Sequence, residues 1–186
     1  SRGYKGKRKE DLLLVRNDKE ILATSVESGD EAFLHALNLK VPVAVSKDRY
    51  KGAVYLRDVC KVDIIIMDDG FQHRKLKKDK NIILIDATNP FGGNEYLPKG
   101  RLRESLKSLN RADELIITKS NYVDSESLKK IKQELLHRFK ICTSMRFVVV
   151  PFVKETLIFQ LAANSRVKWD ANIKKLIIIY ILERWY

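Results

Sequence analysis

The chain has 186 residues, 45% of them hydrophobic and 32% charged, which is typical of a folded globular protein and excludes a disordered segment. Lysine and arginine number 36 against 24 acidic residues, and the resulting net charge of +12 favours anionic partners: nucleic acid, acidic lipid or phosphorylated small molecules. The two cysteines form no CxxC pair, which argues against a disulfide scaffold or structural zinc and fits a reducing cytosolic compartment.

Short apolar runs alternate with amphipathic segments along the chain. Six runs rich in valine, isoleucine and leucine predict β-strands, at Leu12–Val15, Val41–Val45, Val62–Met67, Asn81–Ile85, Glu114–Thr118 and Phe147–Val150. The segments DEAFLHALNL, DRYKGAVYLRDVC and SESLKKIKQELLHRF predict helices, and Ser125 is the expected N-cap of the last. Strands that alternate with helices indicate βαβ units, so we expect an α/β fold with a mainly parallel sheet and helices on both faces.

The two ends of the chain carry weaker signals. The opening SRGYKGKRKED has no initiator methionine, so we expect the chain to be part of a longer protein. The longest apolar run, Leu176–Leu182, is far shorter than the roughly 20 residues of a membrane-spanning helix. Clear periodicity is lost after about Pro151, where we expect a separate or poorly packed segment.

The stretch VDIIIMDDGFQH takes a predicted strand directly into two acids, Asp68 and Asp69. Ligands of open α/β sheets bind outside the carboxyl ends of the strands, where a carboxylate can hold the Mg²⁺ that bridges nucleotide phosphates. An apolar strand followed by aspartate therefore has the form of a Walker B element. A simple turn is the alternative, with an aspartate capping backbone N–H groups and Gly70 at positive φ. The stretch alone leaves both interpretations open.

A cluster of basic side chains follows the acids, at His73, Arg74, Lys75, Lys77, Lys78 and Lys80. Such a cluster suits a phosphate-rich ligand, and a solvated basic loop is the alternative. A nucleic-acid-binding module would also explain the charge. The clusters lack interleaved aromatic residues, however, and no helix-turn-helix or RNA-binding motif occurs, so no nucleic acid partner is expected.

Several separate motifs follow one another between Ser1 and Lys119: SRGYKGK, SGDEAFLHA, VPVAVSKDRYKGA, DDGFQHRKLKKDKNIILIDATNPFGG and LPKGRLRESLKSLNRADELIITK. In this order and spacing they resemble the tetraacyldisaccharide 4'-kinase family, the kinases of lipid A biosynthesis. The resemblance implies a P-loop kinase-like fold that uses ATP and Mg²⁺. It also implies transfer of the ATP γ-phosphate to the 4'-hydroxyl of a tetraacylated glucosamine disaccharide 1-phosphate, the lipid A precursor.

The same resemblance implies a place in the cell and a division of the chain. The protein would be peripheral at the cytoplasmic face of the inner membrane, and the net charge of +12 predicts salt-sensitive attraction to an anionic membrane surface. Residues 1–150 would form the core of the nucleotide and acceptor domain. Residues 151–186 would be a tail that resembles the start of the family's second lobe.

Three acids carry over from the family by position. Asp68 and Asp69 match its Walker B acids, which organise Mg²⁺, and Asp69 is therefore also a candidate catalytic residue. Asp30 matches the aspartate assigned to base chemistry at the acceptor hydroxyl, a role that needs hydrogen-bond reach to the proton removed. A helix N-cap is an equally good interpretation of Asp30 and is compatible with that role.

Four further side chains are expected to bind ligands. His73 would face the nucleotide, and Arg49, Arg74 and Arg103 would bind sugar phosphates, because arginine binds phosphate in bidentate fashion. A structural role is the alternative for His73, and solvent-exposed roles are the alternatives for the arginines.

The chain departs from the family in three places. The Gly-rich loop ending in Gly-Lys-Thr is not in the chain, and His35, His73 and His137 do not match the second-lobe histidine that partners the base. Ser105 stands where the family has proline. We therefore expect the chain alone to be inactive, and a non-catalytic, truncated remnant of such a kinase remains an alternative.

Overall fold

The computed structural model describes residues 3, 6–7, 10–138, 146–149 and 177–182, and these fall into two compact units. The first unit contains the described residues up to Asp68, together with residues 72–77 and 177–178. The second contains residues 69–71, 78–138, 146–149 and 179–182. Each unit has a hydrophobic core of its own and is described by itself.

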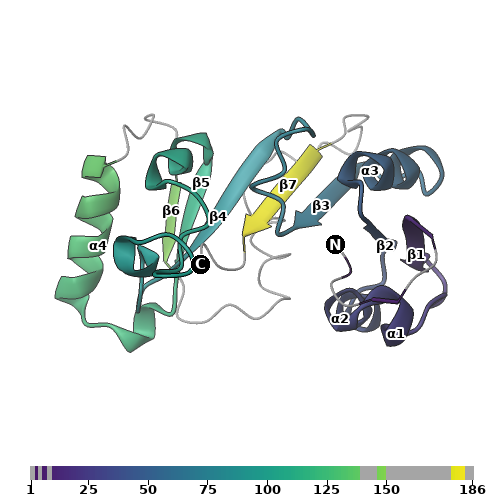
Figure 1. The fold of residues 1–186 in the computed structure, drawn as a ribbon, viewed down its shortest axis with the longest axis horizontal. Coiled ribbons are helices and arrows are strands. Elements are labelled where there is room, and N and C mark those ends of the chain that lie inside the picture. Colours follow the sequence, from purple (N-terminus) through teal and green to yellow (C-terminus); the bar gives the residue numbers. More distant parts are fainter. Residues whose placement is uncertain (1–2, 4–5, 8–9, 139–145, 150–176, 183–186) are drawn as a thin grey trace. The chain divides into compact units, whose positions relative to one another are not determined.

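The first unit contains a two-stranded antiparallel sheet of β1 (Leu12–Arg16) and β2 (Val43–Ser46). Three helices belong to it, α1 (Ser25–Ser28), α2 (Asp30–Asn38) and α3 (Arg49–Asp58), as does the strand β3 (Ile64–Asp68). In Figure 1, α1 and α2 lie beside the β1–β2 pair. The small core between them consists of Val15, Ala23, Ala32, Ala36 and Val45.

Local capping explains where these helices begin. Thr24 and Glu27 form a capping box before α1, in which Glu27 N–H donates to Thr24 Oγ1 and Thr24 N–H donates to Glu27 Oε2. Gly29, at φ 84°, separates α1 from α2 in a conformation that few other residues adopt. Asp48 caps α3, because its Oδ1 accepts from Tyr50 N–H at 2.9 Å.

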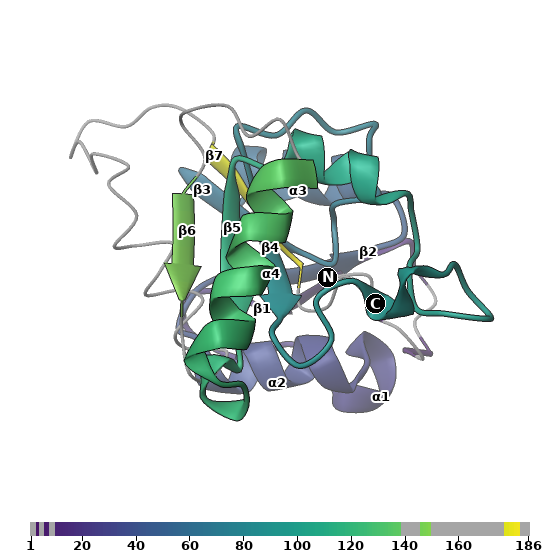
Figure 2. The ribbon, with the colours of Figure 1, turned by 90° about the vertical axis from the view of Figure 1, so that its left-hand side faces the viewer.

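The second unit is built on a parallel ladder in the order β7, β4, β5, β6. The strands are β4 (Lys80–Asp86), β5 (Glu114–Thr118), β6 (Arg146–Val149) and β7 (Ile177–Leu182), and residues 179–182 of β7 pair with Lys80–Ile83 of β4. Figure 2 shows the helix α4 (Ser125–Arg138) running alongside β5. The described connections of this unit include the short 3₁₀ helices η1 (Gly92–Asn94), η2 (Leu106–Arg111) and η3 (Ser120–Tyr122).

Alternate residues of β4 and β5 face opposite sides of the sheet, and both sides are buried. Ile83 and Ile85 of β4 lie in one core with Leu115 and Ile117 of β5, and α4 packs Ile131 and Leu135 into that core. The residues between them, Ile82, Leu84 and Ile116, are also buried. This explains why these strands read as continuous apolar runs and not as an alternating pattern.

All six predicted strands are present, each within two residues of its expected bounds. Two other expectations are corrected, and one strand was not predicted. The strands β1 and β2 form an antiparallel pair of their own, because the apolar runs indicate burial and carry no information on the pairing partner. The run at Leu176–Leu182, considered only for its length, contains the strand β7. Asp124, not Ser125, caps α4, since its Oδ1 accepts from Ser127 N–H at 2.7 Å.

Within the described ranges, no helix is both long and apolar enough to cross a membrane. The expectation for the segment after Pro151 lies almost entirely outside the described residues.

Candidate active site

The two acids lie where the sequence predicts, at the carboxyl end of a strand. Asp68 is the last residue of β3, and Asp69 follows it with φ 46°. The turn interpretation assigned the positive φ to Gly70, and this is wrong, because Asp69 has the left-handed conformation. Aspartate is one of the few non-glycine residues that tolerate it.

The side chain of Asp69 forms an ion pair with Arg103, which lies 34 residues further along the chain. Arg103 Nη1 donates to Asp69 Oδ1 at 2.8 Å and to Oδ2 at 3.0 Å. The two side chains keep 42% (Arg103) and 52% (Asp69) of their surface exposed, so both groups remain accessible to solvent and ligands. The structure thereby brings together two of the predicted site residues.

A second contact joins the same two segments. The guanidinium of Arg111 lies 4.3 Å from the centroid of the Phe71 ring, which is almost fully buried in the second core. Arg111 Nη2 also donates to Glu104 Oε2 at 2.8 Å, so the residue next to Arg103 is held as well. Cation–π contacts and partly buried ion pairs restrict side-chain motion, and the segment 69–71 is therefore held against segment 103–111 at two points.

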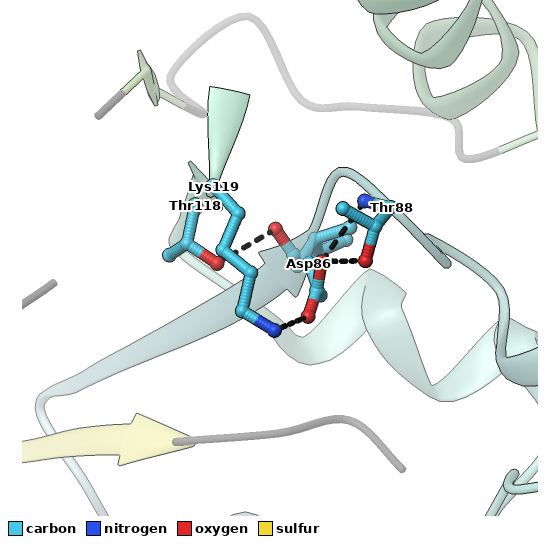
Figure 3. Close-up of polar contacts among 5 residues, drawn as sticks. Asp86, Thr88, Thr118 and Lys119 are labelled. Carbon is cyan, nitrogen blue, oxygen red and sulfur yellow. Dashed lines mark hydrogen bonds and ion pairs between the residues drawn. The ribbon is translucent and has the colours of Figure 1, made fainter. Parts of the chain in front are cut away.

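A polar cluster lies at the carboxyl ends of β4 and β5 (Figure 3). Asp86 Oδ1 accepts from Thr88 N–H at 2.9 Å and from Thr88 Oγ1 at 2.6 Å, while Asp86 Oδ2 forms an ion pair with Lys119. Thr118 Oγ1 donates to the carbonyl of Ile85 at 3.3 Å. These contacts fix the ends of the two strands to each other at the edge where open α/β sheets bind ligands.

The environment of Asp86 favours its ionised form. Burial alone would raise the pKa of Asp86, but the hydrogen bonds from Lys119 and Thr88 outweigh burial and lower the pKa below its ordinary value. No role was predicted for Asp86, Thr88 or Lys119. The available signal was the same as at Asp68: a polar residue placed directly at the end of an apolar strand.

The remaining predicted residues belong to the first unit. Asp30 is the first residue of α2, so the N-cap interpretation is wrong; Gly29 occupies that position. The Asp30 carboxylate is exposed, and within the described residues no donor contacts it. Arg49 is the first residue of α3 and is half-buried, His73 is half-buried, and Arg74 is exposed.

The described part of the chain contains no group of three or more histidine, cysteine or acidic side chains that would form a complete metal site. Mg²⁺ does not require one, because it is usually held by one or two carboxylates together with substrate phosphates and water. Asp69 fits this requirement: its carboxylate is half exposed at a strand end and already interacts with a cation. Asp68 precedes it as the last residue of β3.

Comparison with known proteins identifies the family. A family model described as tetraacyldisaccharide-1-P 4'-kinase matches residues 1–172 of the chain. The chain belongs to this family. The tetraacyldisaccharide 4'-kinase of Elusimicrobium minutum is 38% identical over 165 residues, which cover 78% of this chain and 44% of the relative. That of Chlamydia abortus is 38% identical over 178 residues, which cover 95% of this chain and 42% of the relative.

A solved structure of the family supports the same conclusion on the fold. The crystal structure titled as an "apo" form of LpxK from Aquifex aeolicus in complex with ATP matches with a TM-score of 0.59 and 27% identity. The match covers 97% of this chain and 65% of that chain. The expected α/β, P-loop kinase-like fold is confirmed. The chain spans less than half the length of the two kinases compared above.

Proposed function

We propose that this protein is a lipid A 4'-kinase, which transfers the ATP γ-phosphate to the 4'-hydroxyl of a tetraacyl glucosamine disaccharide 1-phosphate. The family match over residues 1–172 carries the proposal, since the matched relatives are tetraacyldisaccharide 4'-kinases. The acids at the end of β3 support it, because phosphoryl transfer depends on positioning and charge stabilisation and such acids supply both through a metal ion.

Asp68 and Asp69 would hold Mg²⁺, with Asp69 the more exposed of the two carboxylates. When bound, the ion would neutralise charge on the phosphates of ATP. The ion pair of Asp86 with Lys119 holds the carboxyl ends of β4 and β5 together. This edge of the sheet, where we propose that the nucleotide binds, would therefore be ordered before the nucleotide binds.

Asp30 would accept the proton of the acceptor hydroxyl. Its carboxylate is exposed and has no donor among the described residues, so it remains available as a hydrogen-bond acceptor. It lies in the first turn of α2.

The acceptor carries a phosphate group and acyl chains, and the first unit contains basic side chains suited to the phosphate. Arg49 and Arg74 would bind phosphate oxygens, and His73 would lie at the nucleotide. The net charge of +12 supports residence at an anionic membrane surface, which we propose is the cytoplasmic face of the inner membrane.

Transfer of labelled γ-phosphate to tetraacyldisaccharide 1-phosphate, by the protein in its full natural length, tests the proposal. We expect Asp30→Asn and Asp69→Asn each to lower turnover by about 10²-fold or more, the usual contribution of a positioned base or charge-stabilising group. Asp58→Asn is the matched control, because Asp58 is an exposed acid paired with Arg57 at the end of α3. Turnover that is absent in the natural protein, or equal in all three variants, would contradict the proposal.

A further inference from the structure

Among the ion pairs of the described residues, the pair between Arg103 and Asp69 involves the proposed metal ligand itself. Both oxygens of Asp69 accept from a single nitrogen of Arg103, at 2.8 and 3.0 Å. A guanidinium therefore already lies at the position from which a cation would approach this carboxylate.

Arginine and a metal ion cannot share that position. Mg²⁺ binds a carboxylate oxygen at about 2.0–2.1 Å and requires near-octahedral geometry, whereas the arginine nitrogen lies 2.8 Å from the same oxygen. The two cations would also repel each other at this separation. Metal binding at Asp69 thus requires the guanidinium to withdraw from at least one oxygen.

We propose that Arg103 is an exchangeable counter-cation of Asp69. It occupies the cation position while no metal is bound and leaves when a divalent ion binds, and the released guanidinium then becomes a ligand for an anionic group such as a phosphate. This inference rests on the proposed function, because it assumes that Asp69 is a metal ligand. It adds that Arg103 competes with the metal and does not assist its binding.

The weakness of the ion pair makes the exchange possible. Both side chains are about half exposed, and pairs of this kind change an equilibrium constant by about five-fold at most. A buried arginine would block the metal, while one this exposed imposes only a modest competition.

The backbone around the pair does not need to move. Phe71, two residues after Asp69, is buried against the guanidinium of Arg111, and Arg111 holds Glu104, the neighbour of Arg103. Both segments are therefore anchored beside the exchangeable contact. The exchange is a movement of the Arg103 side chain between two partners.

Titration of the chain with Mn²⁺, followed by the electron paramagnetic resonance of the free ion, tests the competition. We expect Arg103→Gln to bind Mn²⁺ about two- to five-fold more tightly than the wild type, and Arg103→Lys to bind it with an affinity within about two-fold of the wild type. Asp69→Asn should bind Mn²⁺ at least about ten-fold more weakly. Arg57→Gln is the matched control: it removes the same charge and an ion pair of similar exposure, at 50% and 51%, and should leave affinity unchanged.

Chemical modification supplies a second measurement. Phenylglyoxal modifies accessible arginines, and mass spectrometry reports the rate at each residue. We expect Mg²⁺ to accelerate modification of Arg103 in a saturable way, and to leave the rate at Arg57 unchanged.

The outcomes separate the two proposals. If Asp69→Asn binds Mn²⁺ as well as the wild type, Asp69 is not a metal ligand, and the metal role in the proposed function fails together with this inference. If Asp69→Asn binds weakly but Arg103→Gln binds no more tightly than the wild type or the Arg57→Gln control, the metal role stands and the competition is refuted. A modification rate at Arg103 that is unaffected by Mg²⁺ would also refute it.

Discussion

Replacing Asp86 with alanine should destabilise the second unit substantially. The substitution leaves Thr88 N–H, the Thr88 hydroxyl and the Lys119 ammonium without the acceptor they share. Hydrogen bonds to a charged group contribute about 1.5–3 kcal/mol each, but Thr88 is exposed and Lys119 keeps 42% of its side chain in water, so both donors are partly resolvated. We therefore expect Asp86→Ala to lower the free energy of unfolding by about 2–3 kcal/mol, measured by urea denaturation and far-ultraviolet circular dichroism.

Two further variants test whether the Asp86 network causes this loss. Asp86→Asn keeps an acceptor for Thr88 and loses only the charge, so it should lower the free energy of unfolding by about 1 kcal/mol. Glu95→Ala is the matched control, because Glu95 forms an exposed ion pair with Lys99, with side-chain exposures of 50% and 77%, and should cost at most about 0.5 kcal/mol. If Asp86→Ala unfolds at the same urea concentration as Glu95→Ala, the network does not stabilise the ends of β4 and β5.

Two other predictions concern charged groups of the second unit. The pKa of Asp86 is lowered from 3.8, so the ionised carboxylate contributes its full stabilisation above that value and loses it as the pH falls through the lowered pKa. Asp86→Asn lacks this titrating group. Its free energy of unfolding should therefore fall less steeply than that of the wild type below about pH 4, as measured by acid denaturation. Lys80→Met should lower the free energy of unfolding by about 3–5 kcal/mol in urea denaturation, because it removes the cation 2.8 Å from Glu114, whose side chain is only 6% exposed. The double variant Lys80→Met with Glu114→Gln should recover most of that stability, because no buried charge is left unpaired. A double variant as unstable as Lys80→Met would contradict the second prediction.

The sequence predicted the elements of the fold better than their arrangement. The run Glu114–Thr118 matches β5 residue for residue, because all five residues are buried and the three central ones are apolar. The antiparallel pairing of β1 with β2 was not predictable in the same way. Strand pairing depends on tertiary contacts between residues such as Leu12 and Ser46, 34 positions apart, and nothing in a local pattern encodes them.

The same limit applies to the candidate site. The position of Asp68 and Asp69 follows from an apolar run and its end, which are local features. Arg103 was expected to bind a phosphate, and its partner in the structure is Asp69, because the chain between them folds back through β4 and its following loops. A pattern of residue types identifies which side chains are chemically suited to a site. The pairing of Asp69 with Arg103 involves tertiary contacts between the two segments, such as that of Phe71 with Arg111, which no local pattern encodes.

The conformation of Asp69 shows which of the two adjacent acids the fold singles out. A left-handed conformation costs most non-glycine residues roughly 1–2 kcal/mol and aspartate less, and Gly70, which would adopt it at no cost, is the next residue. The left-handed residue is nevertheless Asp69, the first residue after β3, and its carboxylate pairs with Arg103. Strain at a residue beside an unstrained alternative is typical of functional positions. Asp68 ends its strand in extended backbone, and the unusual backbone conformation therefore lies at Asp69, the residue that we propose exchanges its arginine for a metal ion.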